Sequence, residues 1–136
     1  MDVTQIPFVE HVGINKNAQD LLELSFDKRV ENHLKTIHAS AQFTLAETAS
    51  GEILQQTFPQ LANKVIPLLR ESTLKFKKPA QQSVIAYPLI APEVEQKFTD
   101  QFAKKGRASI AVEVEIRDVD GTITCSGTFN WFLQGI

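Results

Sequence analysis

Several features that would place a chain in a special structural class are scarce or missing in this sequence. Cys125 is the only cysteine among 136 residues, which excludes an intrachain disulfide framework and a cysteine-rich zinc site. Six glycines and six prolines are too few for collagen or a low-complexity linker. No apolar run approaches the roughly 18 residues of a transmembrane helix. The N-terminus lacks the basic and apolar regions of a secretory signal. These absences favour a soluble cytoplasmic domain.

An excess of charge of either sign is also missing. Fourteen Lys and Arg residues stand against sixteen Asp and Glu residues, which gives a net charge of −2. A dedicated nucleic-acid binder usually carries a strong basic excess, so this function is not expected, and nothing supports a membrane role. The length fits one domain, residues 1–136, because single domains typically run to roughly 100–200 residues.

Hydrophobic periodicity predicts a chain of the α+β class. Alternating polarity predicts strands at about 20–30, 66–78, 83–90, 109–116 and 123–133. Helices are expected at 7–14, at 39–57, and from Pro92 to about Lys105, before Gly106. Residues 31–37 show no periodicity and are expected to form a loop. Asp118 to Gly121 predicts the turn of an antiparallel hairpin.

The 39–57 segment is the most unusual part of the chain. Nearly all of its faces are apolar or small, which is typical of a buried helix, and it would be about 28 Å long. The strands need to bury one face and the helix needs to be covered. A curled antiparallel sheet of about five strands, wrapped around this central helix, satisfies both needs. This arrangement is the hotdog fold.

Glu47 is the first candidate functional residue. Apart from His38, it is the only charged or titratable residue between Lys35 and Glu52. Burial of an unpaired carboxylate is costly, so such a group is usually paired, neutral or functional. Alternatively, Glu47 lies on a narrow exposed stripe of the helix or caps a backbone group.

The predicted start of the same helix is the second candidate. The first N–H groups of a helix lack partners and suit an oxyanion or a polarised carbonyl. Ala39 and Ser40 are small there and would let a substrate approach. His38 could take part in the chemistry, or it could be a helix-capping or solvent-facing histidine.

Helix geometry limits how these candidates could cooperate. Ala39 and Glu47 are eight residues apart, which is about 12 Å along a helix axis. One carbonyl carbon cannot contact both within the same helix. If they cooperate, they come from two chains whose helices pack antiparallel about a two-fold axis, so a homodimer is predicted.

The stretch from Asn32 to Ala49 (NHLKTIHASAQFTLAETA) resembles the central motif of hotdog-fold acyl-CoA thioesterases. The closer resemblance is to the PaaI-like branch and its DUF4442-type relatives. Family members have an Asn or Gln six residues before a His, and an Asp or Glu nine residues after that His. Asn32, His38 and Glu47 keep these spacings. A looser similarity extends over residues 76–80 and 107–132.

The resemblance implies hydrolysis of an acyl-CoA or a related acyl thioester by a homodimer, which could pair further into a tetramer. Glu47 would act as a general base on water or as a nucleophile, and the Ala39 N–H would polarise the thioester carbonyl. Asn32 and His38 would orient the thioester and the water. No metal or redox cofactor is implied.

The sequence departs from the family pattern at three points. Lys35 stands where relatives commonly have Gly, and Ala39-Ser40 replaces Gly-Gly. Gly51 replaces the Ser or Thr that helps to position water in some relatives. Lys35 and Gly51 favour the rival hypothesis, a non-catalytic acyl-CoA-binding or regulatory module. A hotdog hydratase is not expected, because its Asp–His hydration motif is missing.

Substrate contacts are predicted at Lys35, Ser40, Lys77 and Lys78. The basic residues could meet CoA phosphates, as basic residues do in relatives, or form a solvated charged face. Six basic residues are candidates for these phosphate contacts: Lys75, Lys77, Lys78, Lys104, Lys105 and Arg107.

Three aromatic residues, Phe43, Phe58 and Tyr87, could line an acyl tunnel or pack in the core. His33 and His38 are not expected to form a metal site. Cys125 is expected to be a small core residue.

Overall fold

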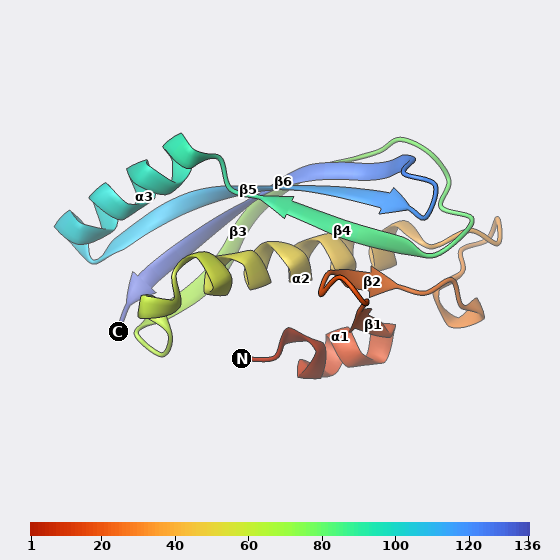
Figure 1. Ribbon diagram of the computed structural model, residues 1–136, viewed down its shortest axis with the longest axis horizontal. Coiled ribbons are helices and arrows are strands. Elements are labelled where there is room, and N and C mark those ends of the chain that lie inside the picture. Colours follow the sequence, from red (N-terminus) through yellow and green to blue (C-terminus); the bar gives the residue numbers. More distant parts are fainter.

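Six antiparallel strands form one curled sheet, as Figure 1 shows for the computed structural model, which describes residues 1–136. The strands pair in the order β1 (Ile14–Lys16), β2 (Leu22–Leu24), β4 (Val84–Leu89), β5 (Arg107–Asp118), β6 (Ile123–Gly135) and β3 (Val65–Phe76). β3 therefore lies at one edge of the sheet, and its outer side has no partner strand.

The long helix α2 (Ala39–Thr57) runs along the concave side of this sheet (Figure 1). Its buried side carries mostly small residues, among them Ala41, Ala46 and Ala49, which let the helix approach the strands closely. The first helix, α1 (Pro7–Val12), lies on the other side of α2, next to β1 and β2. The predicted hotdog arrangement, with the sheet wrapped around one central helix, is confirmed.

A third helix, α3 (Pro92–Lys105), packs on β5 at the end of the sheet where α2 ends (Figure 1). Phe98 of α3 contacts Phe58, with their ring centroids 4.9 Å apart. Short 3-10 helices complete the chain: η1 (Val3–Gln5), η2 (Lys28–Val30) and η3 (Pro59–Leu61). None of the helices has both the length and the apolar character that crossing a bilayer would need.

The β5–β6 hairpin follows its sequence pattern closely. Ile110, Val112, Val114 and Ile116 are buried on one face of β5, as the alternation predicts. The Asp118 carboxylate accepts hydrogen bonds from the N–H groups of Asp120 (2.9 Å) and Thr122 (3.0 Å) across the turn. Cys125 of β6 is fully buried in the core, and burial raises the pKa of its thiol to about 11.

The N-terminal third differs from its prediction in three respects. The expected helix 7–14 ends at Val12, because Gly13 adopts a left-handed φ of +90°. Ile14 then begins β1, a sixth strand that was not predicted. The expected strand 20–30 shrinks to Leu22–Leu24, because Asp27 caps the 3-10 turn at Lys28–Val30 by accepting from the Arg29 N–H (3.0 Å).

Candidate functional site

A groove with a volume of about 760 Å³ runs along one side of α2, between the N-terminal segment and residues of β3 and β6. We call it the α2 groove. Five of the residues that α2 contributes recur at three- and four-residue steps along one side of the helix: Thr44, Glu47, Thr48, Gly51, Gln55. Glu52, Leu54 and Gln56 of α2 also line the groove. The other walls come from the N-terminal segment Met1–Val9, from η3, from the start of β3 and from β6.

Glu47 is the charged side chain of this groove that has no partner. Its carboxylate is partly buried and makes no hydrogen bond or ion pair within the chain, and burial raises its pKa above the usual carboxyl value. Glu52, five residues on, lines the same groove but forms an ion pair with Lys16 of β1, with Nζ and Oε2 2.7 Å apart. The chain therefore neutralises one groove carboxylate and leaves the other free.

Two threonines flank Glu47 on the groove face. The Thr44 hydroxyl donates to the Ser40 carbonyl (2.9 Å), and the Thr48 hydroxyl donates to the Thr44 carbonyl (2.6 Å). Each oxygen can still accept a hydrogen bond from water. At Gly51 a Cβ would lie 3.4 Å from the Trp131 ring, so the glycine leaves space at the point where some relatives carry a hydroxyl.

At the start of α2, His38 is the helix N-cap. Its Nδ1 accepts a hydrogen bond from the Ser40 N–H at 2.9 Å, so the capping interpretation of this histidine holds. The same bond leaves Nε2 available as a donor. The Ala39 N–H donates to no group of the chain, and both residues are exposed. An unused backbone donor thus stands beside an imidazole donor at the open end of α2.

Asn32 shapes the loop that leads into α2. Its Oδ1 accepts from the N–H groups of Leu34 (2.8 Å) and Thr36 (3.0 Å), and its Nδ2 donates to the Thr36 hydroxyl (2.8 Å). Lys35 within this loop has a left-handed φ of +62°. The glycine that relatives commonly have there would adopt this conformation at lower cost.

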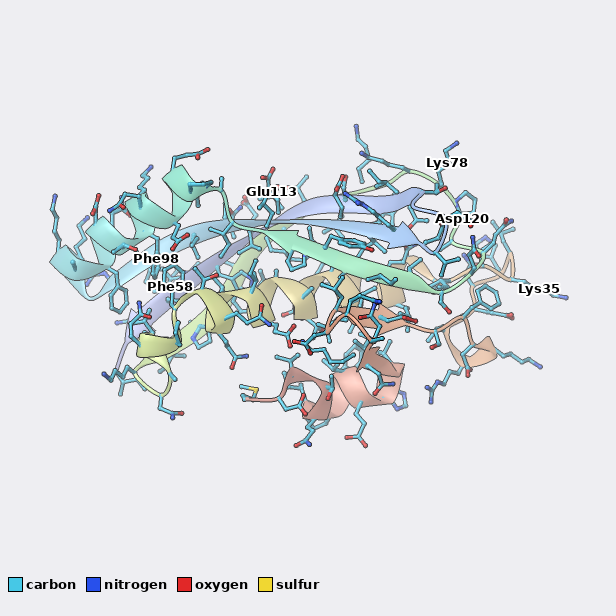
Figure 2. All side chains as sticks on the ribbon, viewed as in Figure 1. Lys35, Phe58, Lys78, Phe98, Glu113 and Asp120 are labelled. Atoms are coloured by element: carbon cyan, nitrogen blue, oxygen red, sulfur yellow. The ribbon has the colours of Figure 1, made fainter.

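The predicted basic residues divide into two groups. The Ile37 N–H donates to the Ala80 carbonyl (2.9 Å), which holds the segment after β3 against the start of α2. Lys35 and Lys78 consequently lie at the same end of the molecule in Figure 2, and Lys77 precedes Lys78. Lys104 and Lys105 end α3 and Arg107 begins β5 at the opposite end (Figure 1), so the six predicted basic residues do not form one surface.

The three candidate aromatic residues also separate. Phe58 lines the α2 groove. Phe43 packs against Phe129 with ring centroids 5.6 Å apart, and the Tyr87 ring lies under the Arg117 guanidinium, 4.6 Å from its centroid. Only Phe58 is therefore placed where it could contact a ligand in this groove.

The structure brings His38, Ala39 and Ser40 together and places Glu47 about 12 Å along the helix axis from them. Sequence reasoning missed the N-terminal segment and Trp131 as groove residues, and Lys16 as the partner of Glu52. The helical spacing of the groove face of α2 was the one available signal. No three His, Cys, Asp or Glu side chains gather where they could hold a metal ion.

The fold places this protein among the hotdog proteins. More particularly, it belongs to the DUF4442 family, a domain of unknown function, whose model matches residues 4–133. No curated protein matches the chain significantly.

Several solved structures share its fold. A Pseudomonas aeruginosa protein of unknown function, described as a probable thioesterase, is 22% identical with a TM-score of 0.84, covering 98% of this chain and 91% of that chain. A Bacillus halodurans protein solved with CoA is 20% identical with a TM-score of 0.72, covering 93% and 74%. A mutant thioesterase enzyme from Staphylococcus aureus is 16% identical with a TM-score of 0.71, covering 94% and 98%. These similarities show the fold that the chain shares with those proteins.

The left-handed loop residue gives a first prediction. Lys35→Gly should raise the free energy of unfolding by about 1 kcal/mol, because glycine relieves the penalty of a side chain at positive φ. Chemical denaturation would measure this change. Asn63→Gly is the matched control: Asn63 has a φ of +61°, but asparagine tolerates this region, so its gain should be smaller. A loss of stability in Lys35→Gly would contradict the prediction.

The unpartnered carboxylate gives a second prediction. Because the pKa of Glu47 is raised in the folded state, its ionised form destabilises the fold above that pKa, and the penalty fades as the pH falls through it. Glu47→Gln should therefore melt at a higher temperature than wild type at pH 8, and the difference should shrink as the pH falls through the raised pKa. Thermal unfolding across this pH range would test it. Glu113→Gln, at an exposed position on β5, should show no such trend.

Proposed function

We propose that the protein hydrolyses an acyl-CoA, or a related acyl thioester, to the free acid and the thiol. The observation that carries this proposal is the free carboxylate of Glu47 in a largely apolar groove whose other carboxylate is paired. A partly buried carboxylate with a raised pKa is suited to accept a proton from water near neutral pH. The thioesterase-like fold of the neighbours is consistent with this chemistry.

In the proposed reaction, Glu47 removes a proton from a water molecule as the water oxygen bonds to the thioester carbonyl carbon. The Ala39 N–H and the positive end of the α2 dipole stabilise the resulting oxyanion, and the His38 Nε2 donor orients the carbonyl. The carbon–sulfur bond then breaks, and the proton held by Glu47 passes to the departing thiolate. The step as proposed uses water and no metal or redox cofactor.

A homodimer is part of the proposal, because Glu47 and Ala39 of one chain are about 12 Å apart along α2. The outer edge of β3 supports it. This edge is twelve residues long, unpaired, and carries exposed Ile66, Leu68 and Phe76, a combination that favours pairing with another strand. Pairing of two β3 edges about a two-fold axis would set the two α2 helices side by side and antiparallel.

In such a dimer, the start of the partner's α2 would lie next to Glu47. The lysines at that end, Lys35, Lys77 and Lys78, would then flank the same site and could bind the phosphates of CoA, with Ser40 beside the thioester. The left-handed φ of Lys35 supports this role, since a strained side chain is retained most readily where it has a function. A further pairing of dimers into a tetramer is compatible with this arrangement.

The catalytic role of Glu47 can be tested by thiol release from a panel of acyl-CoAs. Glu47→Gln should lower kcat/KM by about 10²–10⁴-fold, because it keeps the shape of the side chain and removes the base. Glu113→Gln, on the far face of the sheet in Figure 2, is the matched control and should leave the rate unchanged. An unchanged kcat/KM in Glu47→Gln would contradict this mechanism. CoA esters that bind without turnover would instead identify the non-catalytic module that Lys35 and Gly51 favour.

The composite site can be tested by complementation between two inactive variants. Ala39→Pro removes the proposed oxyanion donor, and proline is tolerated at the first helical position. His38 already has the extended conformation (φ −60°, ψ 139°) that a residue before proline prefers.

Mixing Ala39→Pro with Glu47→Gln and allowing subunits to exchange should restore activity to about a quarter of the wild-type value. Half of the dimers are then mixed, and each mixed dimer contains one intact composite site and one doubly altered site. Each variant alone should stay inactive. A mixture as inactive as its components would place both groups in one chain and contradict the composite site.

A further inference from the structure

The part of the α2 groove beyond Glu47 is long, apolar and built from four separate segments. Beyond Glu47, the helix wall ends at Phe58, and the groove also holds Leu61 of η3 and Trp131 of β6. The opposite wall is the N-terminal segment, which contributes apolar side chains along its length: Met1, Val3, Ile6, Phe8, Val9. The volume of about 760 Å³ lies within the range of small-molecule sites, which runs from about 300 to 1,000 Å³.

Two of the polar side chains that border this stretch are already paired. The Glu52 carboxylate is paired with Lys16, and the Gln55 Oε1 accepts a hydrogen bond from the terminal ammonium of Met1 at 3.1 Å. The other two, Gln56 and Asn63, are solvent-exposed, so the buried lining of this stretch is mainly apolar. A hydrocarbon chain needs no polar partner and would gain free energy from its transfer out of water.

The length of the groove sets the length of that chain. Glu47 and Phe58 are eleven residues apart on α2, which corresponds to about 16 Å along the axis. An extended chain advances about 1.2 Å per bond, so this span accommodates on the order of a dozen carbon atoms. A short acyl group or a single aromatic ring would leave most of the groove empty.

The proposed dimer leaves this stretch open. With the two α2 helices antiparallel, the partner's helix begins beside Glu47 and runs back along the first half of α2. The second half, from Thr48 to Phe58, has no partner helix beside it. A thioester at Glu47 would therefore direct its CoA portion towards the partner's lysines and its acyl chain along the second half of α2.

We propose that the α2 groove beyond Glu47 binds the acyl chain of a saturated, unbranched fatty acyl thioester of about a dozen carbons, with the N-terminal segment as one wall. This inference rests on the proposed function, since it assigns the substrate class of the same site. Under this proposal, residues 1–9 help to determine which acyl chain lengths the site accepts.

A chain-length series tests the groove directly. For saturated acyl-CoAs from four to sixteen carbons, kcat/KM should rise about fourfold per added CH₂ up to about twelve carbons and then level off. Ala62→Phe introduces a large side chain at an exposed position that lines the far end of the groove. It should move the plateau to shorter chains. Ala103→Phe, at an exposed position on α3 outside the groove, is the matched control.

Trp131 provides a readout that does not depend on turnover. It is the only tryptophan of the chain and it lines the groove, so a bound chain should change its fluorescence. Dodecanoate should change the emission in wild type and in Ala103→Phe, and should do so weakly in Ala62→Phe. Butanoate at the same concentration should have little effect in any of them.

The two readouts separate failure of this inference from failure of the proposed function. Hydrolysis that depends on Glu47 but not on chain length, with emission unaffected by dodecanoate, would overturn the groove assignment and leave the hydrolysis proposal standing. Dodecanoate binding that Ala62→Phe weakens, without hydrolysis of any acyl-CoA, would support the groove and overturn the hydrolysis. A chain-length profile and an emission response that Ala62→Phe leaves unchanged would also overturn the assignment, including the case in which a partner chain fills the groove.

Discussion

The seating of α2 on the sheet is the interaction on which the other features depend. Small side chains let the helix approach the strands, and two buried polar contacts from β6 fix its rotation. The Thr124 hydroxyl donates to the Gln42 Oε1 at 2.8 Å, and the Trp131 indole N–H donates to the Ser50 hydroxyl at 2.9 Å. Loss of either partner would leave a buried polar group unsatisfied, which costs about 1–3 kcal/mol. With the sheet side of the helix fixed in this way, the direction of Glu47 is fixed too.

Burial of an unpaired carboxylate costs free energy, and the chain carries this cost at Glu47 but not at the neighbouring Glu52. Glu52 and Glu47 line the same groove, but a lysine neutralises only the first. A structure selected for stability alone would be expected to pair both or to replace the second. The difference between two glutamates that line one groove is therefore better evidence for function than the burial of either one.

Local pattern was sufficient to predict most of the fold, because β5, β6, α2 and α3 are long and each keeps one period throughout. β1 was not predicted and β2 was predicted too long, because strands of three residues are too short to define a period and are held by their neighbours. For the site, the motif spacing identified Glu47 and the start of α2. It could not show that the Asn32 side chain is committed to its own loop, since that depends on which hydrogen bonds form. Nor could it reveal a groove whose walls come from both ends of the chain.

The rise of the α-helix links these observations into one argument about assembly. A carboxylate and a helix N-terminus placed eight residues apart are too distant to share a carbonyl within one chain. The same separation is what two antiparallel helices need if each is to supply the group that the other lacks. Under the proposed dimer, every α2 would serve two sites, one through its first N–H and one through Glu47. Neither helix would then fill the part of the groove beside the second half of α2, beyond Glu47. The apolar side chains of the N-terminal segment gather at this part of the groove.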